Sequence, residues 1–412
     1  MYVQKEPARL VRIVGQAPLQ ATIYELERLR CSLCGQVFTA PEPEGIGAEK
    51  YDETAAAMIA QLKYGSGTPF YRLAQLEQRM GIPLPASTQW ELIEEAAEVL
   101  KPARDELIRQ AAQGELMHND DTSMRVLQMQ RPEGDKRSGV FTSGIVSAPA
   151  IGAAGGVRIA LYFTGREHAG ENLTAVLAQR AAGLPPVVQM CDALSRNSPK
   201  LGEGVELLLA NCWRKSLKRI LAHGRRQFVE IVGSFPAECR FVLESLGKVY
   251  GNDAAARQQG LNPEQRLQFH RQHSSPIMTA LEKWMETQIT GRIVEPNSSL
   301  GKAIVYMQRH WKPLTLFLRQ AGAPLDNNVC ERAIKKAVLN RKNALFYKTM
   351  NGAEVGDLLA QELKAHFMTL IHTCELNAVN SFDYLVAMLR NPKAVAQSPA
   401  DWMPWSFQLA AG

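Results

Sequence analysis

The sequence predicts a mixed α/β fold in which a sheet is followed by a large helical insertion. The 412 residues are 46% apolar and 21% charged, which is typical of a soluble globular protein with at least one sizeable core. Strand-like alternation is concentrated between residues 115 and 193, and helical periodicity dominates on either side. Strands, a helix crossing to a further strand and then many helices indicate this architecture.

The N-terminal part is expected to hold two small units. Residues 1–45 read as short strands and turns carrying Cys31 and Cys34, and residues 46–113 as a helical domain. Helices are predicted over 53–64, 70–80 and 87–111, the last capped by Ser87 or Thr88. Two interpretations of this domain remain open, a helix-turn-helix with Gly81 in its turn and a plain helical bundle.

The sheet is expected within residues 114–232. Residues 115–129 and 137–148 could form an antiparallel pair, 155–163 a third strand and 170–183 a helix, before a buried strand at 185–193. A helical insertion is predicted over 233–322 and the final core helices over 323–390. A tail of 391–412 completes the chain.

The charge and cysteine content indicate an intracellular, reducing environment. The net charge is +6, and no apolar stretch of the length required for a membrane helix occurs. The start of the chain does not resemble a signal peptide, and seven scattered cysteines fit reduced thiols. We therefore expect a cytoplasmic protein without a membrane segment.

Acidic residues at three places are candidates for a site. Asp120 and Asp121 are adjacent on a predicted strand and must project from opposite faces, so only one can enter a given site. Asp192 ends a buried strand, although a solvated strand-end Asp is an equally good interpretation. Asp326 is a good N-cap for a helix with Glu331 in its early turns, and a surface pair of Glu331 with Lys335 is the simpler alternative.

Three carboxylates drawn from two strands and a helix can hold two divalent ions that act on a phosphodiester. Oxygen ligands suit Mg²⁺. Two basic clusters accompany the acidic residues and are expected to contact phosphate groups of a polyanion. Their members are Arg214, Lys215, Lys218, Arg219, Arg225, Arg226, Arg332, Lys335, Lys336, Arg341 and Lys342.

Several motifs together resemble the insertion-sequence sixty-six family of bacterial transposases. They are "MHNDDTSMRVL", "CDAL", "LAHGRRQF", "PLDNNVCERAIKKAVLNRKNALFYKTMNGAEVGDLL", "LIHTCELNAVNSFDYL" and "WMPW". The resemblance implies a ribonuclease-H-like DDE fold with a helical insertion before the final Glu. It also implies cleavage of element ends by a metal-activated water and attack of the freed 3′-hydroxyl on target DNA.

The resemblance assigns the family's catalytic acids to Asp120, Asp192 and Glu331, with two Mg²⁺ ions or Mn²⁺ as cofactor. It further implies double-stranded DNA as partner, a homo-oligomer on DNA and accessory transposition proteins. The family's zinc-binding region is longer than the single pair Cys31 and Cys34, which suggests a shortened N-terminus and too few Zn²⁺ ligands. Residues 213–220 and 360–367 look inserted, so an inactive remnant that only binds DNA is the alternative.

Overall fold

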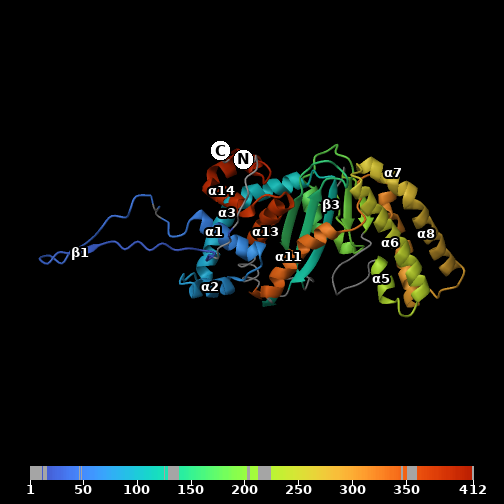
Figure 1. Cartoon of the computed structure of the whole chain (residues 1–412), viewed down its shortest axis with the longest axis horizontal. Coiled ribbons are helices and arrows are strands. Elements are labelled where there is room, and N and C mark those ends of the chain that lie inside the picture. The colour runs from blue at the N-terminus through green and yellow to red at the C-terminus, as the bar shows by residue number, and fades with distance from the viewer. Residues whose placement is uncertain are drawn as a thin grey trace, which may run out of the picture.

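A five-stranded mixed sheet forms the centre of the structure (Figure 1). The computed structural model describes residues 12, 16–45, 47, 49–124, 126–128, 139–201, 205–211, 224–344, 347–349 and 360–410. The strand order is β6-β5-β3-β7-β8, with β5 antiparallel to β3 and β6, β7 parallel to β3, and β8 parallel to β7. The strands are β3 (Leu116–Met124), β5 (Val140–Ala148), β6 (Ile159–Gly165), β7 (Val187–Cys191) and β8 (Leu207–Asn211). The mixed sheet predicted from the sequence is therefore confirmed.

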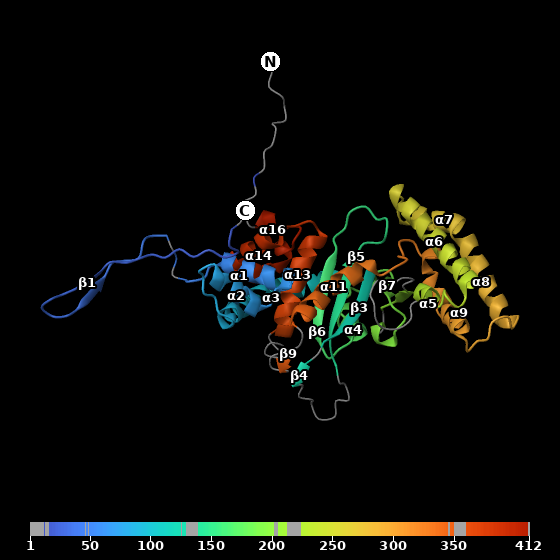
Figure 2. The same ribbon diagram turned by 60° about the horizontal axis from the view of Figure 1, so that its bottom comes forward.

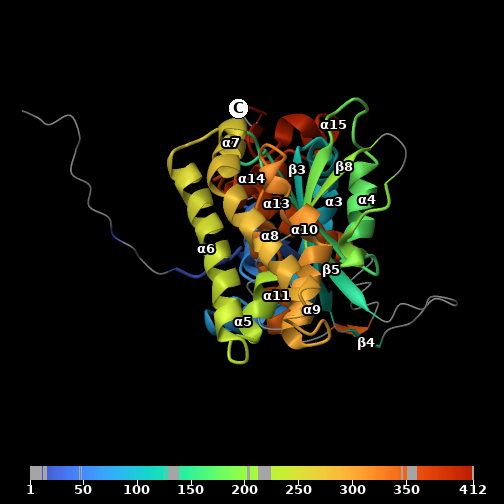
Figure 3. The same cartoon turned by 90° about the vertical axis from the view of Figure 1, so that its right-hand side faces the viewer.

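Helices cover both faces of this sheet, which explains why the residues of its inner strands are buried on both sides. Gly144 of β5 faces α11 (Asn328–Ala344), since a Cβ added there would lie 2.9 Å from Cδ1 of Ile334. The neighbouring Ser143 faces α4 (Ala169–Leu177), where its Oγ accepts a hydrogen bond of 3.0 Å from Nδ2 of Asn172. Figure 1 shows α11 crossing the front of the sheet, and Figure 3 shows α4 beside it. Successive residues of one strand thus separate the two layers.

A helix also covers the outer edge of the sheet. The N–H of Tyr162 in β6 donates to Oγ1 of Thr369 (3.0 Å), and the N–H of Ala160 donates to Oγ1 of Thr373 (3.1 Å). Both threonines lie on α13 (Ala360–Leu376), four residues apart and therefore on one helix face. Their hydroxyls satisfy backbone groups that an edge strand would otherwise present to solvent or to another chain.

One apolar core joins the helices at the two ends of the chain (Figure 2). The rings of Tyr64 and Phe367 stack with centroids 5.2 Å apart, which connects an N-terminal helix to α13. The N-terminal elements are α1 (Glu53–Ala60), the π-helix η1 (Gln61–Gly65), α2 (Phe70–Arg79) and α3 (Ala86–Ala111). The C-terminal ones are α14 (Ser381–Arg390), α15 (Pro392–Gln397), η4 (Pro399–Trp402) and α16 (Phe407–Ala410).

Two predicted helix boundaries are wrong, the start of α3 by less than one turn and the end of α4 by more than one turn. The helix α3 begins at Ala86, directly after Pro85, so neither Ser87 nor Thr88 caps it. The helix α4 ends at Leu177, and the residues up to Gly183 form turns instead of continuing it. Gly183 has a φ of +81°, a left-handed conformation that glycine adopts easily and that does not extend a helix.

The helical insertion has a core of its own (Figure 3). It contains α5 (Gly224–Glu230), α6 (Pro236–Gln258), α7 (Pro263–His273), α8 (Ser275–Thr290), α9 (Ser299–Arg309), α10 (Trp311–Leu314) and η3 (Leu316–Leu318). A buried ion pair joins Asp253 of α6 to Arg266 of α7, and Nη1 of Arg266 donates to the carbonyl of Ala323 (2.8 Å). That second contact connects the insertion to the segment that leads into α11.

The pKa of Asp253 is held at about 2. Burial alone would raise it, but the hydrogen bond from His270 and the positive charges of Arg266 and Arg257 outweigh that effect. Asp253 is therefore ionised at neutral pH, and the pair with Arg266 is complete.

Two short strand pairs lie outside the main sheet. β1 (Arg28–Arg30) and β2 (Val37–Thr39) form a hairpin that extends away from the helices in Figure 1, and β4 (Val126–Gln128) pairs in parallel with β9 (Tyr347–Thr349). Within the described ranges, none of the helices combines the length and the apolar character that crossing a bilayer requires.

Candidate active site

The two adjacent aspartates of β3 point into different layers. Asp120 pairs with Gly144 across the sheet, so its side chain lies on the face that α11 covers. Asp121 lies on the opposite face, where its Oδ2 accepts a hydrogen bond from Nδ1 of His168 (2.9 Å) and its Oδ1 contacts Nη2 of Arg196 (3.2 Å). Only Asp120 therefore shares a layer with the helix that carries Glu331.

Asp192 follows β7 directly and lies beside Asp120 at the same end of the sheet. The last parallel pair joins His118 to Met190, and continuing this register by two residues sets Asp120 next to Asp192. One carboxylate oxygen of Asp192, Oδ1, accepts hydrogen bonds from the N–H of Leu194 (3.3 Å) and from the side-chain amide of Asn197. Asp192 is 5% exposed, so it is not the solvated strand-end residue of the alternative interpretation.

Asn197 connects both aspartate-bearing strands, and the sequence analysis did not identify it. Its carbonyl accepts hydrogen bonds from Nδ2 of Asn119 in β3 (2.8 Å) and from Nε2 of Gln189 in β7 (2.7 Å), while its own amide donates to Asp192. The residue is fully buried in the short helix η2 (Ser195–Asn197). Only its position, five residues after Asp192, could have suggested this role.

Glu331 lies in the first turn of α11, as predicted, and the start of this helix is tied to β3. The side chain of Asn327 accepts a hydrogen bond from Nδ1 of His118 (2.8 Å) and donates one to the carbonyl of Asn119 (3.1 Å). The carbonyl of Asn327 in turn accepts the N–H of Glu331 (3.0 Å). The helix begins at Asn328, two residues after Asp326, because Asn327 provides the carbonyl that starts the helical pattern.

His118 is neutral in this arrangement. Burial lowers its pKa to about 4, and the hydrogen bond with Asn327 raises it by less. Because Oδ1 of the Asn327 side chain is an acceptor, the neutral ring carries its proton on Nδ1 and donates it in a hydrogen bond to that oxygen. The contact therefore fixes both the tautomer and the orientation of the ring.

Three buried carboxyl groups thus come from β3, from the end of β7 and from α11. Asp120, Asp192 and Glu331 are each only 5–6% exposed. Their oxygen donors fit the chemistry of a hard divalent cation. In the part of the chain that the structure describes, however, no three side chains of His, Cys, Asp or Glu form a group arranged to hold a metal ion. The three carboxyl groups are the type of ligand that Mg²⁺ prefers, but they are not grouped as a metal site in this structure.

The basic residues of α11 separate into two sets. Arg332, Lys335 and Lys342 are exposed and follow one another on one side of the helix. Lys336 instead forms an ion pair with Glu375 of α13, and Nη1 of Arg341 donates to Oγ1 of Thr122 (2.8 Å). The first set faces solvent, where phosphates could reach it, while the second holds α11 in place.

The other predicted DNA contacts are only partly within the described residues. Arg225 and Arg226 lie in α5, where Nε of Arg226 pairs with Oε1 of Glu230 (2.6 Å). The remaining members of that cluster lie outside the described residues, namely Arg214, Lys215, Lys218 and Arg219. Their contact with DNA stays a prediction.

Cys31 and Cys34 lie in the turn of the β1–β2 hairpin. The N–H of Gly35 donates to the carbonyl of Cys31 (2.9 Å), and backbone N–H groups of Cys34 and Leu33 lower the pKa of the Cys31 thiol. Such a turn presents two thiols together, but structural zinc takes four ligands. Among the described residues no third ligand completes the pair, and zinc binding stays a prediction.

The turn between α2 and α3 has the outline of a helix-turn-helix, but α3 does not present the surface with which such a motif contacts DNA bases. Gln89, in the first turn of α3, is fully buried and donates to the carbonyls of Leu84 (3.0 Å) and Phe70 (3.2 Å). The residues of α3 that do reach solvent beyond it include Glu91 and Glu95. An acidic face next to DNA is unfavourable, so these contacts favour the bundle interpretation.

Comparison with known proteins identifies relatives of this chain. Three proteins of Sinorhizobium fredii, all named as uncharacterized, are similar to this chain. They are y4jD, 28% identical over 92% of this chain and 71% of its own length; y4qI, 26% identical over 86% and 62%; and y4hP, 24% identical over 93% and 68%. The chain thus spans less than two thirds of y4qI.

Residues 49–355 match the family model described as "Transposase IS66 family", a region that includes β3, β7 and the first turn of α11. The match covers most of the chain and contains Asp120, Asp192 and Glu331. The protein therefore belongs to the IS66 family of transposases.

Proposed function

We propose that this protein is a DDE transposase of a bacterial insertion sequence. It cleaves the ends of its element and joins the freed 3′-hydroxyls to target DNA, with Asp120, Asp192 and Glu331 as catalytic carboxylates. The proposal is supported by the register of β3 and β7, which sets Asp120 beside Asp192, and by the contacts of Asn327, which tie the first turn of α11 with Glu331 to β3.

The strand order supports a ribonuclease-H-like fold for the catalytic core. Three antiparallel strands, β3, β5 and β6, are followed by β7 and β8, which extend the sheet in parallel from β3. The helical insertion then separates β8 from α11 (Figure 2). This arrangement accounts for the long stretch of chain between Asp192 and Glu331.

Asp120, Asp192 and Glu331 would hold two Mg²⁺ ions, or Mn²⁺, which supply an activated oxygen nucleophile and stabilise the leaving oxygen of a phosphodiester. Buried carboxylates repel one another, so cations favour their approach. Asn197 orients one oxygen of Asp192, and Asn327 fixes the first turn of α11. Because the described residues contain no group of side chains arranged to hold a metal ion, the proposal requires the three carboxyl groups to move closer together when ions and DNA bind.

DNA would be held beside the acids by Arg332, Lys335 and Lys342, which are exposed on the same helix as Glu331. Contacts of this kind provide affinity without selecting a sequence. We extend the proposal to a homo-oligomer that pairs two DNA ends, assisted by accessory transposition proteins. That extension is supported by the family resemblance alone.

A second candidate function is DNA binding by a catalytically inactive relative. The lack of a metal-binding arrangement among the described residues favours it, because a relative without catalytic activity does not need to hold its three carboxyl groups together. The exposed basic side of α11 would serve either function equally. The two candidates differ in whether a divalent ion produces cleaved DNA.

The test is cleavage and strand transfer of labelled element-end duplex with Mg²⁺, with Mn²⁺ and with EDTA. We expect ion-dependent nicking by the wild type and a loss of about 10³-fold in Asp192→Asn and Glu331→Gln, as when a transition-state contact is removed. The matched controls are the exposed Asp105→Asn and Glu286→Gln, which should retain full activity. DNA binding with equal inertness of wild type and variants would establish the second candidate instead.

A further inference from the structure

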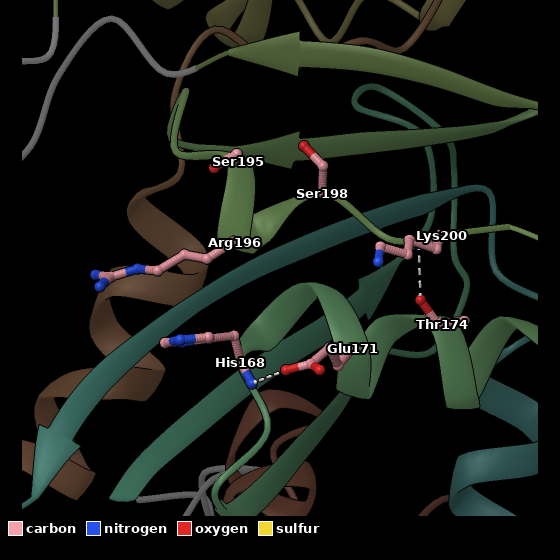
Figure 4. Close-up of a pocket in the computed structure, with 7 residues that line it drawn as sticks. All are labelled: His168, Glu171, Thr174, Ser195, Arg196, Ser198 and Lys200. Atoms are coloured by element: carbon pink, nitrogen blue, oxygen red, sulfur yellow. Dashed lines mark hydrogen bonds between the residues drawn. The ribbon is translucent and has the colours of Figure 1, made fainter. Parts of the chain in front are cut away.

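A cavity of about 360 Å³ lies on the face of the sheet opposite to α11, between α4 and the segment that follows β7 (Figure 4). Figure 4 shows Arg196 and His168 extending in the same direction, with Lys200 at the other end. The lining residues are His168, Glu171, Thr174, Ser195, Arg196, Ser198 and Lys200. None of these residues takes part in the proposed catalytic group.

Asp121 holds two of the side chains that line the cavity, those of Arg196 and His168. Its carboxylate contacts Nη2 of Arg196 (3.2 Å) and accepts a hydrogen bond from Nδ1 of His168 (2.9 Å), while its side chain is only 1% exposed. The Arg196 side chain is 41% exposed, so the guanidinium is anchored at one point and still reaches solvent. A guanidinium has five N–H donors, and this leaves donors for a ligand.

The remaining lining groups also favour an anion. Lys200 is exposed, and its backbone N–H donates to Oγ1 of Thr174 (3.0 Å), which fixes its position beside α4. Ser195 and Ser198 add hydroxyl donors. The one acidic lining residue is Glu171, whose Oε2 accepts the N–H of His168 (2.8 Å) at the start of α4. Arginine, lysine and hydroxyl groups around one space match the oxygens of a phosphate.

The cavity is adjacent to the proposed catalytic group. Ser195 and Arg196 directly precede Asn197, whose side chain donates to Asp192, and Ser198 directly follows it. A DNA strand with one phosphate at Asp192 would therefore carry a neighbouring phosphate past this segment. We propose that the cavity binds a backbone phosphate of that DNA strand, a proposal that rests on the function proposed above.

The test is DNA binding by the full chain without divalent ions, measured by fluorescence anisotropy at several salt concentrations. Removal of one phosphate contact lowers the salt slope by about 0.9, which corresponds to about eightfold weaker binding at 0.1 M salt. We expect that loss in Lys200→Ala and its recovery in Lys200→Arg. Lys302→Ala, which removes an exposed lysine of the helical insertion, is the matched control and should bind like the wild type.

A second arm separates DNA from free phosphate as the ligand. The melting temperatures of wild type and Lys200→Ala are compared in inorganic phosphate and in chloride at equal ionic strength. Selective stabilisation of the wild type by phosphate, with unchanged DNA affinity in Lys200→Ala, would overturn the proposal in favour of a small phosphate ligand.

Equal affinity and salt slope for wild type and Lys200→Ala would also overturn it, while leaving the proposed transposase function intact. A wild type that fails to bind DNA at all would overturn both proposals. These outcomes keep the two failures distinguishable.

Discussion

The side chains of His118 and Asn327 are joined by a hydrogen bond of 2.8 Å, although 209 residues separate them in the chain. His118 lies on β3 two residues before Asp120, and Asn327 lies four residues before Glu331. Asn327 also donates to the carbonyl of Asn119 (3.1 Å). These two contacts make the position of Glu331 depend on the strand that carries Asp120.

Removal of the Asn327 side chain should therefore affect both stability and catalysis. Asn327→Ala leaves a buried donor on His118 and a buried carbonyl on Asn119 without this partner, which costs about 1–3 kcal/mol of unfolding free energy. Urea unfolding measures that loss, and cleavage should fall more than DNA affinity. The exposed Asn297→Ala is the control. An unchanged unfolding midpoint in Asn327→Ala would contradict the link between β3 and α11.

Gly144 is required by the close approach of α11 to the sheet. A Cβ there would lie 2.9 Å from Cδ1 and 3.1 Å from Cγ1 of Ile334, so Gly144→Ala should displace α11 and cost about 1–3 kcal/mol. Gly251→Ala is the matched control, because it lies in α6 with nothing within 4 Å of the added carbon. It should stabilise the protein by about 0.5–1 kcal/mol. Similar unfolding energies for both variants would argue against tight packing at Gly144.

Asn197 should hold Asp192 in the orientation that cleavage requires. In Asn197→Asp a second carboxylate replaces the amide donor, and like charges at this distance raise the pKa of one member of the pair. We expect the pH profile of cleavage to move to higher pH, while DNA affinity changes little. Asn197→Ala removes the hydrogen bonds without adding charge, so it should lower stability without that displacement. Identical pH profiles in Asn197→Asp and wild type would reject the positioning role.

A low pH should lower the stability of the helical insertion, because it protonates Asp253. Its pKa is about 2 in the folded protein and near 3.9 in an unfolded chain, so its stabilisation is complete above about pH 4 and is lost as the pH falls towards 2. Asp253→Asn should remove this dependence between pH 4 and 2, and should lower stability at neutral pH because Arg266 stays buried without its partner. Urea unfolding across that pH range is the measurement. Parallel pH dependence in the two proteins would exclude Asp253 as its source.

The threonine contacts at the edge of β6 can be tested by isosteric replacement. Thr369→Val and Thr373→Val each remove the acceptor of one buried N–H, so each should cost about 1–3 kcal/mol. Thr287→Val, on the exposed side of α8, is the control and should change the unfolding energy far less. Size-exclusion chromatography of the double variant would detect pairing of the uncovered strand with a second molecule. Full stability in the double variant would contradict the contact.

Local sequence patterns were sufficient to predict most of the fold. Alternation in β3 and β5 predicted an antiparallel pair, and the apolar run of β7 predicted a buried strand beside them, because periodicity reflects which faces are covered. The ends of α3 and α4 were less predictable. There, Pro85 starts a helix without a side-chain cap, and tight turns follow Leu177.

The sequence by itself determined the order of the elements, the acidic residues at β3, β7 and α11, and the motifs shared with the transposase family. Only the tertiary structure decided that Asp120 shares a layer with Glu331 while Asp121 anchors Arg196 and His168. It also decided that Asn197 and Asn327 bind the strands together, and that Lys336 and Arg341 contact their own protein. Such contacts join residues far apart in the chain, and sequence periodicity carries information only about neighbours on the same element.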